Sequence, residues 1–271
     1  MGNASGRPAA ADAAISYGRA HIFHEALALL EYRRLLTDPI LAGAGVADGR
    51  GCPVLVIPGF LAPDLAVKTL VGWLRRTGYH AAYPHIGPNM RCGEPTVRRL
   101  ERRLETLAER QGERVVVIGH SRGGQFARVL GVRRPDLVRT VITLATPRMD
   151  VGTIHPLVYV SVRALSALRR FGVAGVMGPG CLSGACCEEL RADAIAPLPV
   201  GVSLVCVVAR LDGFVDRHAC ADTAAQTVVT VKASHIGTTL NPETYRAIAA
   251  ALVRSGASDV DGSDGRLAAA G

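Results

Sequence analysis

Short apolar runs alternate along the chain with longer segments in which apolar residues recur every three or four positions. The apolar runs carry few charges, and the run at 115–118 is wholly β-branched, which is typical of strands covered on both faces of a sheet. These runs predict strands at 54–57, 79–83, 115–118, 138–144, 202–209 and 227–232. The periodic segments predict helices at 21–36, 65–77, 96–111, 125–134 and 242–253.

The alternation of strands and helices predicts the fold class. Strands joined by helices of this length require right-handed crossovers and a parallel sheet. We therefore expect an α/β fold with a mostly parallel central sheet flanked by helices. The chain has 271 residues, enough for one large domain. We expect this domain to span 19–254, between a mobile N-terminal segment at 1–18 and a flexible tail at 255–271.

Two segments lie outside the regular core. In the predicted helix at 21–36, Ile22, Ala26, Leu29 and Leu30 share one face, and we expect this helix to pack on the edge of the domain. The segment 149–199 interrupts the alternation with a helical piece at 156–171 and a bend rich in Gly and Pro. An insertion of this size at the mouth of a parallel sheet usually forms a cap over the site, so we expect a helical cap.

A pentapeptide of the form G-x-S-x-G separates a predicted strand from a predicted helix. Its sequence is Gly119-His120-Ser121-Arg122-Gly123. In a nucleophile elbow, the strained turn exposes the serine hydroxyl, and the flanking glycines let neighbouring chain pass close by. The pattern favours Ser121 as a nucleophile over a purely structural tight turn.

Four positions directly follow predicted strands, where the working groups of a parallel sheet lie. They are Phe60, Ser121, Asp212 and His235. A serine hydroxyl is a poor nucleophile until a base removes its proton, and a third group must hold that base in one tautomer. Ser121, His235 and Asp212 are therefore the candidates for the nucleophile, the base and the orienting acid.

Three other histidines compete with His235 for the role of base. We expect His120 to point away from the serine, because it occupies the second position of the elbow. His155 falls in the predicted cap, and His218 falls in the helix after the acid loop. His235, just past the last strand and among small residues, is favoured.

Asp216 competes with Asp212 for the role of acid. Asp212 follows its strand more closely and precedes Gly213, which suits a tight turn that presents a carboxylate. Asp216 is also suited to cap a helix that begins near Arg217. Asp150, after the preceding strand, is a more distant alternative.

The developing oxyanion needs backbone N–H donors that already point at it. One is expected from Arg122, directly after the nucleophile, and the other from Phe60 or Leu61 in the loop after the first strand. Apolar residues nearby either line an acyl pocket or pack the cap on the core. They are Phe60, Leu61, Leu157, Val158 and Phe214.

The chain resembles the α/β-hydrolase superfamily. The resemblance rests on the order Ser121, Asp212, His235, with Pro58-Gly59-Phe60 upstream. Within the superfamily, the pieces look most like bacterial lipases and esterases with short cores. The acid loop Arg210-Leu-Asp-Gly-Phe-Val and the histidine loop Ser234-His-Ile-Gly are similar to those of these enzymes.

The resemblance covers about 53–253 and is weakest over 149–199. One departure is Pro58, where many relatives have a histidine before the oxyanion-loop glycine. The resemblance implies a carboxylic ester hydrolase of esterase or lipase type that forms an acyl-enzyme and needs no cofactor. The alternatives within the same superfamily are an acyltransferase, a thioesterase, an amidase and a non-catalytic interaction protein.

The seven cysteines allow three interpretations. Cys181, Cys186 and Cys187 would bind a metal with Cys220 or His218, but their spacing fits no standard zinc pattern. A disulfide from Cys181 or Cys186 to Cys220 would tie the cap to the acid loop and indicate export. We favour reduced, partly buried cysteines and expect no metal.

Composition and charge limit the kinds of substrate and binding partner that we expect. The net charge is +8, almost all from arginine. Such a charge suits anionic lipid surfaces, acidic substrates or nucleic acid, but we favour an ordinary solvated surface as its explanation. Aromatic residues make up only 4% of the chain, and no nucleic-acid-binding module occurs. We expect a small-molecule or lipid ester as substrate, with transient lipid-surface contact left open, and no nucleic acid.

The expected location in the cell rests on two kinds of segment that the sequence lacks. No stretch reaches the roughly 18 uninterrupted apolar residues of a membrane span. The first residues lack the basic start and apolar run of a signal peptide. We expect a cytoplasmic protein, with export as the alternative that a disulfide would indicate.

Overall fold

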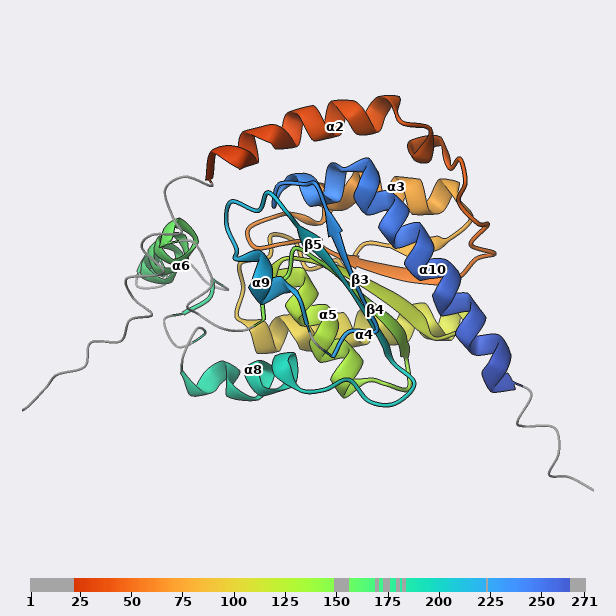
Figure 1. Cartoon of the computed structure of the whole chain (residues 1–271). Coiled ribbons are helices and arrows are strands. Elements are labelled where there is room, and N and C mark those ends of the chain that lie inside the picture. Colours follow the sequence, from red (N-terminus) through yellow and green to blue (C-terminus); the bar gives the residue numbers. More distant parts are fainter. Residues whose placement is uncertain are drawn as a thin grey trace, which may run out of the picture.

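The computed structural model describes residues 22–148, 156–168, 171–172, 176–178, 181, 184–222 and 224–263. Six strands form one sheet in the order β2-β1-β3-β4-β5-β6, and every neighbouring pair is parallel (Figure 1). The strands are β1 (Pro53–Ile57), β2 (His80–Ala82), β3 (Val115–His120), β4 (Val138–Leu144), β5 (Ser203–Ala209) and β6 (Thr227–Val231). The predicted α/β class with a parallel sheet is confirmed.

The order of the strands reverses beside β1. The chain places β2 on one side of β1 and then returns to place β3 on the other side. In a parallel sheet, such a reversal leaves a crevice outside the carboxyl ends of the two strands, where ligands bind. Phe60 lies in the loop after β1 and Ser121 directly follows β3, so the topology brings these two residues to the same crevice.

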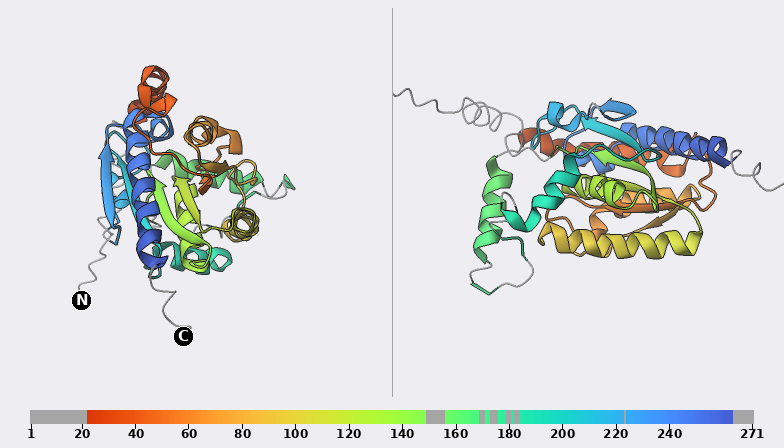
Figure 2. Two further views of the ribbon diagram at one scale, coloured as in Figure 1. Left: turned by 90° about the vertical axis from the view of Figure 1, so that its right-hand side faces the viewer. Right: turned by 90° about the horizontal axis from the view of Figure 1, so that it is seen from below.

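Helices cover both faces of the sheet (Figures 1 and 2). One face packs against α4 (Gly93–Gln111), α5 (Arg122–Arg133) and α8 (Glu188–Ile195). The other face packs against α3 (Lys68–Arg76) and α10 (Pro242–Ser263), with α2 (Ala28–Thr37) on the same side. Side chains alternate between the two cores along each strand, since Leu55 and Ile57 face the first and Val54 and Val56 the second.

The described chain contains further helical elements besides those of the two layers. They are η1 (Ile22–Leu27), η2 (Pro39–Ala42), η3 (Asp64–Val67), α6 (Pro156–Leu168), η6 (Ala185–Cys187), α9 (Arg217–Cys220) and η7 (Gly237–Leu240). The helix α6 stands at one end of the molecule, beyond the helices that flank the sheet (Figure 2). The segment 149–199 therefore has two parts, because α8 packs with α5 whereas α6 lies outside the sheet layers.

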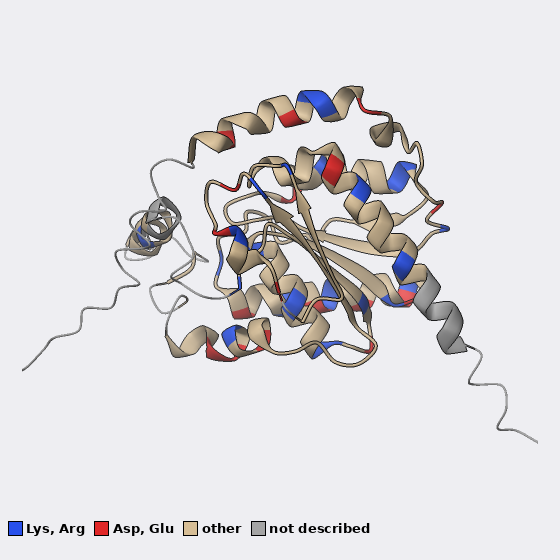
Figure 3. Cartoon of the chain, viewed as in Figure 1, with Lys and Arg blue, Asp and Glu red and all other residues tan. Residues whose placement is uncertain are grey.

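Charged residues follow the outer faces of the helices. The apolar face of α4 is buried, and it consists of Val97, Leu100, Leu104 and Leu107. Basic and acidic residues alternate along the same helices (Figure 3). Arg133 of α5, for example, binds Glu94 of α4 at 2.9 Å and Asp193 of α8 at 2.6 Å. Some of the arginine side chains thus form ion pairs that join neighbouring helices.

The N-terminal helical segment packs through a different face from the one its periodicity predicts. Leu29 and Leu30, on the predicted apolar face, are 67% and 49% exposed, whereas Glu31 is only 3% exposed and Leu35 is fully buried. The expected packing face is therefore wrong. The physical reason is that the Glu31 carboxylate has buried hydrogen-bond donors from a distant loop, which compensate for its desolvation.

The last helix extends beyond the predicted start of the tail. Helix α10 continues to Ser263, so the part of the predicted tail from 255 to 263 is helical. Ser255 is buried, and its hydroxyl lies 2.7 Å from the hydroxyl of Thr140 in β4. A polar residue that looks like the start of a tail is thus part of the contact between α10 and the sheet.

Candidate active site

The chain turns sharply between β3 and α5. Ser121 has φ 51° and ψ −122°, a backbone conformation that costs a residue with a side chain roughly 1–3 kcal/mol. A Cβ atom at Gly123 would meet the carbonyl oxygens of Ile57 and Pro58 at the end of β1. The strain and the close approach of β1 are the features expected of a nucleophile elbow.

The two other candidate residues contact each other. His235 Nδ1 lies 2.7 Å from Asp212 Oδ2, and both side chains are buried. The second carboxylate oxygen of Asp212 accepts the backbone N–H groups of Phe214 at 2.9 Å and Val215 at 2.8 Å. The carboxylate is therefore fixed by its own loop, and it holds His235 with Nδ1 protonated and Nε2 free to act as a base.

The environment of His235 favours its charged form. Burial alone would lower the pKa of this imidazole, but the charge and hydrogen bond of Asp212 and the charge of Glu25 raise it above the ordinary value. The opposite holds for His120, because burial and the neighbouring His235 lower the pKa of His120 to about 3. His120 is thus neutral at physiological pH.

His120 packs against the histidine loop. Its ring centroid lies 4.9 Å from that of His235, and its Nε2 lies 2.9 Å from the His235 backbone oxygen. A carbonyl oxygen only accepts, so Nε2 of His120 carries the proton and donates it. Gly59 has no side chain to block the ring, since a Cβ there would meet His120 Nδ1. His120 is a support for the histidine loop.

The other candidates for the acid and the base have different contacts or fall outside the described residues. Asp216 caps α9, because its carboxylate accepts the backbone N–H of His218 at 2.9 Å. His218 is exposed, and its Nε2 lies 3.4 Å from Arg217 Nε. His155 and Asp150 lie outside the described residues.

Two glutamates of the N-terminal segment hold the acid and histidine loops from outside. Glu25 accepts the N–H of Gly213 at 2.9 Å and that of His235 at 3.0 Å through Oε1, and that of Ile236 at 2.8 Å through Oε2 (its partners lie up to 211 residues away in the chain). Glu31 accepts the N–H of Ser234 at 2.9 Å. Sequence reasoning did not identify either residue.

The loop after β1 is fixed through Asn89, which is fully buried. Asn89 donates from Nδ2 to the carbonyl of Pro58 at 2.9 Å and accepts the N–H of Leu61 at 3.1 Å with its backbone oxygen. Arg122 in turn donates to both oxygens of Asn89, at 2.8 and 3.1 Å. Because the Leu61 N–H already has an acceptor, the Phe60 N–H is the better candidate for an oxyanion donor.

Arg122 combines two roles at this point of the chain. Its backbone N–H lies in the first turn of α5, directly after Ser121, where helix N–H groups lack partners within the helix. Its guanidinium lies 4.8 Å from the ring centroid of Phe126 and 6.0 Å from that of Phe60. Burial lowers the pKa of this guanidinium to about 10, so it stays charged at physiological pH.

A cavity of about 610 Å³ opens beside these groups. Ser121, His235, Phe60 and Arg122 line it together, and most of its other walls are apolar. Leu61 and Phe214 of the predicted pocket also line it, and Ser161 and Val162 of α6 contribute from the cap segment. The side chains of Leu157 and Val158 lie outside the described residues.

The cysteines fit the favoured prediction of reduced, partly buried thiols. None of the seven forms a disulfide, so the expected alternative of a disulfide to Cys220 is wrong. Cys220 is buried in a small separate cluster with Val208 and Val215, away from Cys181 and Cys186. Cys206 packs in the core within β5.

One further feature bears on membrane contact. Among the described residues, no helix combines the length and apolar character required to cross a bilayer.

Comparison with known proteins gives matches in structure but not in sequence. No model of a known protein family matches the chain, and no curated protein matches it either. The mature lipase BlEst2 from Bacillus licheniformis is 15% identical over 77% of this chain and 94% of its own, with a TM-score of 0.55. The metagenomic carboxyl esterase MGS0156 is 17% identical over 77% of each chain, with a TM-score of 0.54.

A third match is a soluble variant of monoglyceride lipase from Saccharomyces cerevisiae. It is 14% identical over 78% of this chain and 88% of its own, with a TM-score of 0.54. The parallel sheet, its flanking helices and these matches define the α/β-hydrolase fold, and this chain has that fold.

Proposed function

We propose that this protein is a serine hydrolase that cleaves carboxylic esters through an acyl-enzyme on Ser121. The observation that carries the proposal is the meeting of a strained serine with a buried His235–Asp212 pair on one apolar cavity. The lipases and esterases with a similar fold support the same chemistry, although they are similar in fold alone.

In the proposed reaction, Ser121 Oγ attacks the ester carbonyl while His235 Nε2 takes its proton. Asp212 stabilises the imidazolium that forms. The backbone N–H groups of Phe60 and Arg122 donate to the oxyanion of the tetrahedral intermediate. His235 then protonates the leaving alcohol, and a water activated by the same imidazole releases the acid and restores Ser121.

The cavity favours an uncharged aliphatic acyl group. Its walls near Ser121 include Phe60, Leu61 and Phe214, and Val162 adds an apolar surface from α6. Burial of such walls against a hydrocarbon chain stabilises the complex by about 25 cal/mol per Å² of apolar surface removed from water. An esterase or lipase acting on fatty acyl esters is therefore the type of hydrolase we propose.

The test is the initial rate of hydrolysis of p-nitrophenyl esters from acetyl to palmitoyl. We expect turnover by the wild type and a loss of about 10³-fold or more in kcat for Ser121→Ala. Ser203→Ala is the matched control, because Ser203 begins β5 at the end of the strand remote from the site, and it should keep the wild-type rate. Equal rates for the wild type and Ser121→Ala on every ester would contradict the proposal.

A further inference from the structure

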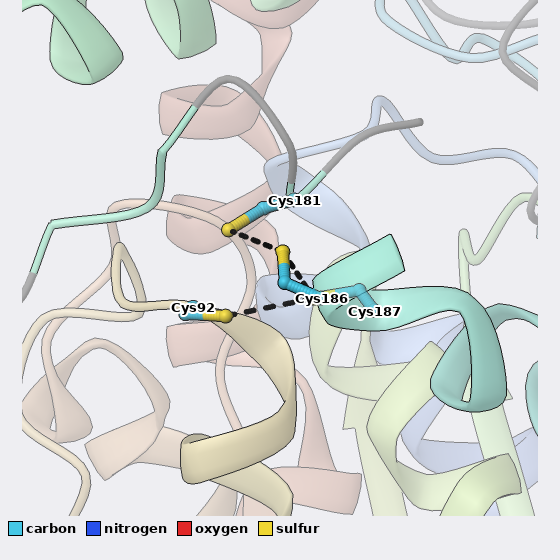
Figure 4. A group of neighbouring side chains, drawn as sticks. All are labelled: Cys92, Cys181, Cys186 and Cys187. Carbon is cyan, nitrogen blue, oxygen red and sulfur yellow. Dashed lines mark hydrogen bonds between the residues drawn. The ribbon is translucent and has the colours of Figure 1, made fainter. Parts of the chain in front are cut away.

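Four cysteines from two distant parts of the chain gather beside the cavity. Cys92 directly precedes α4, whereas Cys181, Cys186 and Cys187 lie between α6 and α8 (Figure 4). All four sulfur atoms lie within 4.8 Å of one another. The separation is 3.5 Å between Cys92 and Cys187, and 3.8 Å from Cys186 to both Cys181 and Cys187.

These separations match a tetrahedral metal site. Zinc binds thiolates at about 2.3 Å, so a regular tetrahedron of four sulfurs around zinc has edges of about 3.8 Å. A disulfide would bring two of the sulfurs to about 2.05 Å, and all four cysteines are free. An iron–sulfur cluster would hold its cysteine sulfurs farther apart, because several iron and sulfide atoms separate them.

Two of the sulfurs lie beside groups that stabilise negative charge. Cys187 Sγ lies beside Gly93, 3.7 Å from where a Cβ on that glycine would stand. Gly93 begins α4, a helix of 19 residues whose positive N-terminal pole stabilises negative charge. The backbone N–H of Gly178 donates to Cys181 Sγ at 3.3 Å. Hydrogen bonds of this kind orient the ligands of metal sites.

A positive charge lies next to the cluster. Four thiolates around Zn²⁺ leave a site of net charge about −2, which needs compensation where it is partly buried. The Arg122 guanidinium lies close enough to Cys92, Cys181 and Cys187 to interact with their charge. Cys181 and Cys187 are 7% and 3% exposed, so water screens this interaction poorly.

We propose that Cys92, Cys181, Cys186 and Cys187 bind one Zn²⁺ in a closed, structural tetrathiolate site. Each thiol gives up its proton on binding, and no electron is transferred. The closed set of four protein ligands leaves no position for substrate, so the metal has a structural role. The chemistry of Ser121 and His235 does not involve it.

The zinc ion would join the cap segment to the body of the protein. Cys181 and Cys187 line the same cavity as Ser121, and Arg91, next to Cys92, accepts a hydrogen bond from Arg122 at 2.7 Å through its carbonyl. The site would therefore fix one wall of the cavity against the start of α4. Direct metal ligation replaces the packing that a short, glycine-rich segment cannot supply.

The first experiment measures bound metal in the full chain. Protein expressed with added ZnCl₂ is dialysed and analysed for metal by mass spectrometry, beside Cys92→Ser, Cys187→Ser and the control Cys220→Ser. Cys220 is buried like Cys187 but lies outside the cluster. We expect about one zinc ion per chain in the wild type and in Cys220→Ser, and background zinc in the other two variants.

A second experiment does not depend on the folding of the variants. Co²⁺ added to metal-free wild-type protein should give thiolate-to-cobalt charge transfer and the intense visible bands of tetrahedral coordination. Zinc at background level together with no cobalt spectrum would overturn the proposal. A peptide map showing Cys92 disulfide-bonded to Cys187 in protein kept under reducing conditions would also overturn it. Neither readout uses a substrate, so both are independent of ester hydrolysis.

Discussion

The imidazole of His235 faces charged and titratable groups from three parts of the chain. Asp212 accepts its Nδ1 proton at 2.7 Å, and Glu25 adds negative charge from the N-terminal segment. The third group is His120, whose ring lies 4.9 Å away and is neutral because burial lowers its pKa. The two carboxylates outweigh burial, so the pKa of His235 is raised.

This arrangement predicts the acidic limb of the pH profile. His235 accepts a proton only when neutral, so kcat/KM for ester hydrolysis should fall as pH decreases through a value above the ordinary histidine pKa of about 6.5. In Glu25→Gln the negative charge is lost, the pKa of His235 falls, and the limb should move to lower pH by up to about 1 unit. The measurement is kcat/KM against pH for both proteins.

Glu189→Gln provides the control for this shift. Glu189 is exposed on α8, outside the acid and histidine loops, and its removal changes the net charge equally. Its profile should coincide with that of the wild type. A limb in Glu25→Gln that stays in place or moves to higher pH would show that Glu25 does not act on His235.

The turn between β3 and α5 depends on contacts between backbones. Gly123 in α5 touches the carbonyls of Ile57 and Pro58, and Gly119 in β3 lies against the backbone of Gly123 and Gly124. Backbone cannot move aside as a long side chain does, so these glycines fix the distance between β1, β3 and α5. The same contacts set Ser121 beside the loop that carries Phe60.

Gly123→Ala should therefore destabilise the fold. The added methyl group would overlap the carbonyls of Ile57 and Pro58, and we expect the free energy of unfolding to fall by about 1–3 kcal/mol. Gly72→Ala in α3 is the matched control, because a Cβ there meets only the flexible end of Arg76 at 3.5 Å. Alanine in that helix should stabilise by up to about 1 kcal/mol. Denaturant unfolding measures both, and equal stabilities would contradict this account of the turn.

Strands could be predicted from the sequence because their apolar runs are local. The run at 138–144 coincides with β4, and 54–57 differs from β1 by one residue at its start. The same strand pattern placed Ser121, Asp212 and His235 at the carboxyl ends of parallel strands, and in the structure His235 contacts Asp212 and lines one cavity with Ser121. These predictions depend only on the spacing of apolar residues and on the right-handed connection between parallel strands.

Contacts between distant segments could not be predicted in the same way. Glu25 and His235 are 210 residues apart, and nothing near Glu25 indicates that its carboxylate meets a loop backbone. The apolar periodicity around Leu29 and Leu30 indicated the wrong face for the same reason. Cys92 is separated from Cys187 by 95 residues, so its place in the cysteine cluster was also missed.

At the scale of the whole molecule, one cavity is lined by loops and helices between Pro58 and Leu240. The loops after β1 and β3 form its floor, the cap segment with Val162 forms one wall, and the histidine loop forms another. Glu25 and Glu31 hold that loop from the N-terminal segment, and the proposed zinc site would hold the cap segment to α4. The glutamate hydrogen bonds and the proposed zinc site would each fix one wall of the cavity.

Covalent labelling tests the central claim, that Ser121 is an activated nucleophile. A fluorophosphonate reacts with a serine only where a base and an oxyanion site activate it. Intact-mass analysis of the folded protein should show a single adduct, and peptide mapping should locate it on Ser121. Ser121→Ala should remain unlabelled, and His235→Ala should react far more slowly than the wild type. An unlabelled wild type, or an adduct that persists in Ser121→Ala, would contradict the account.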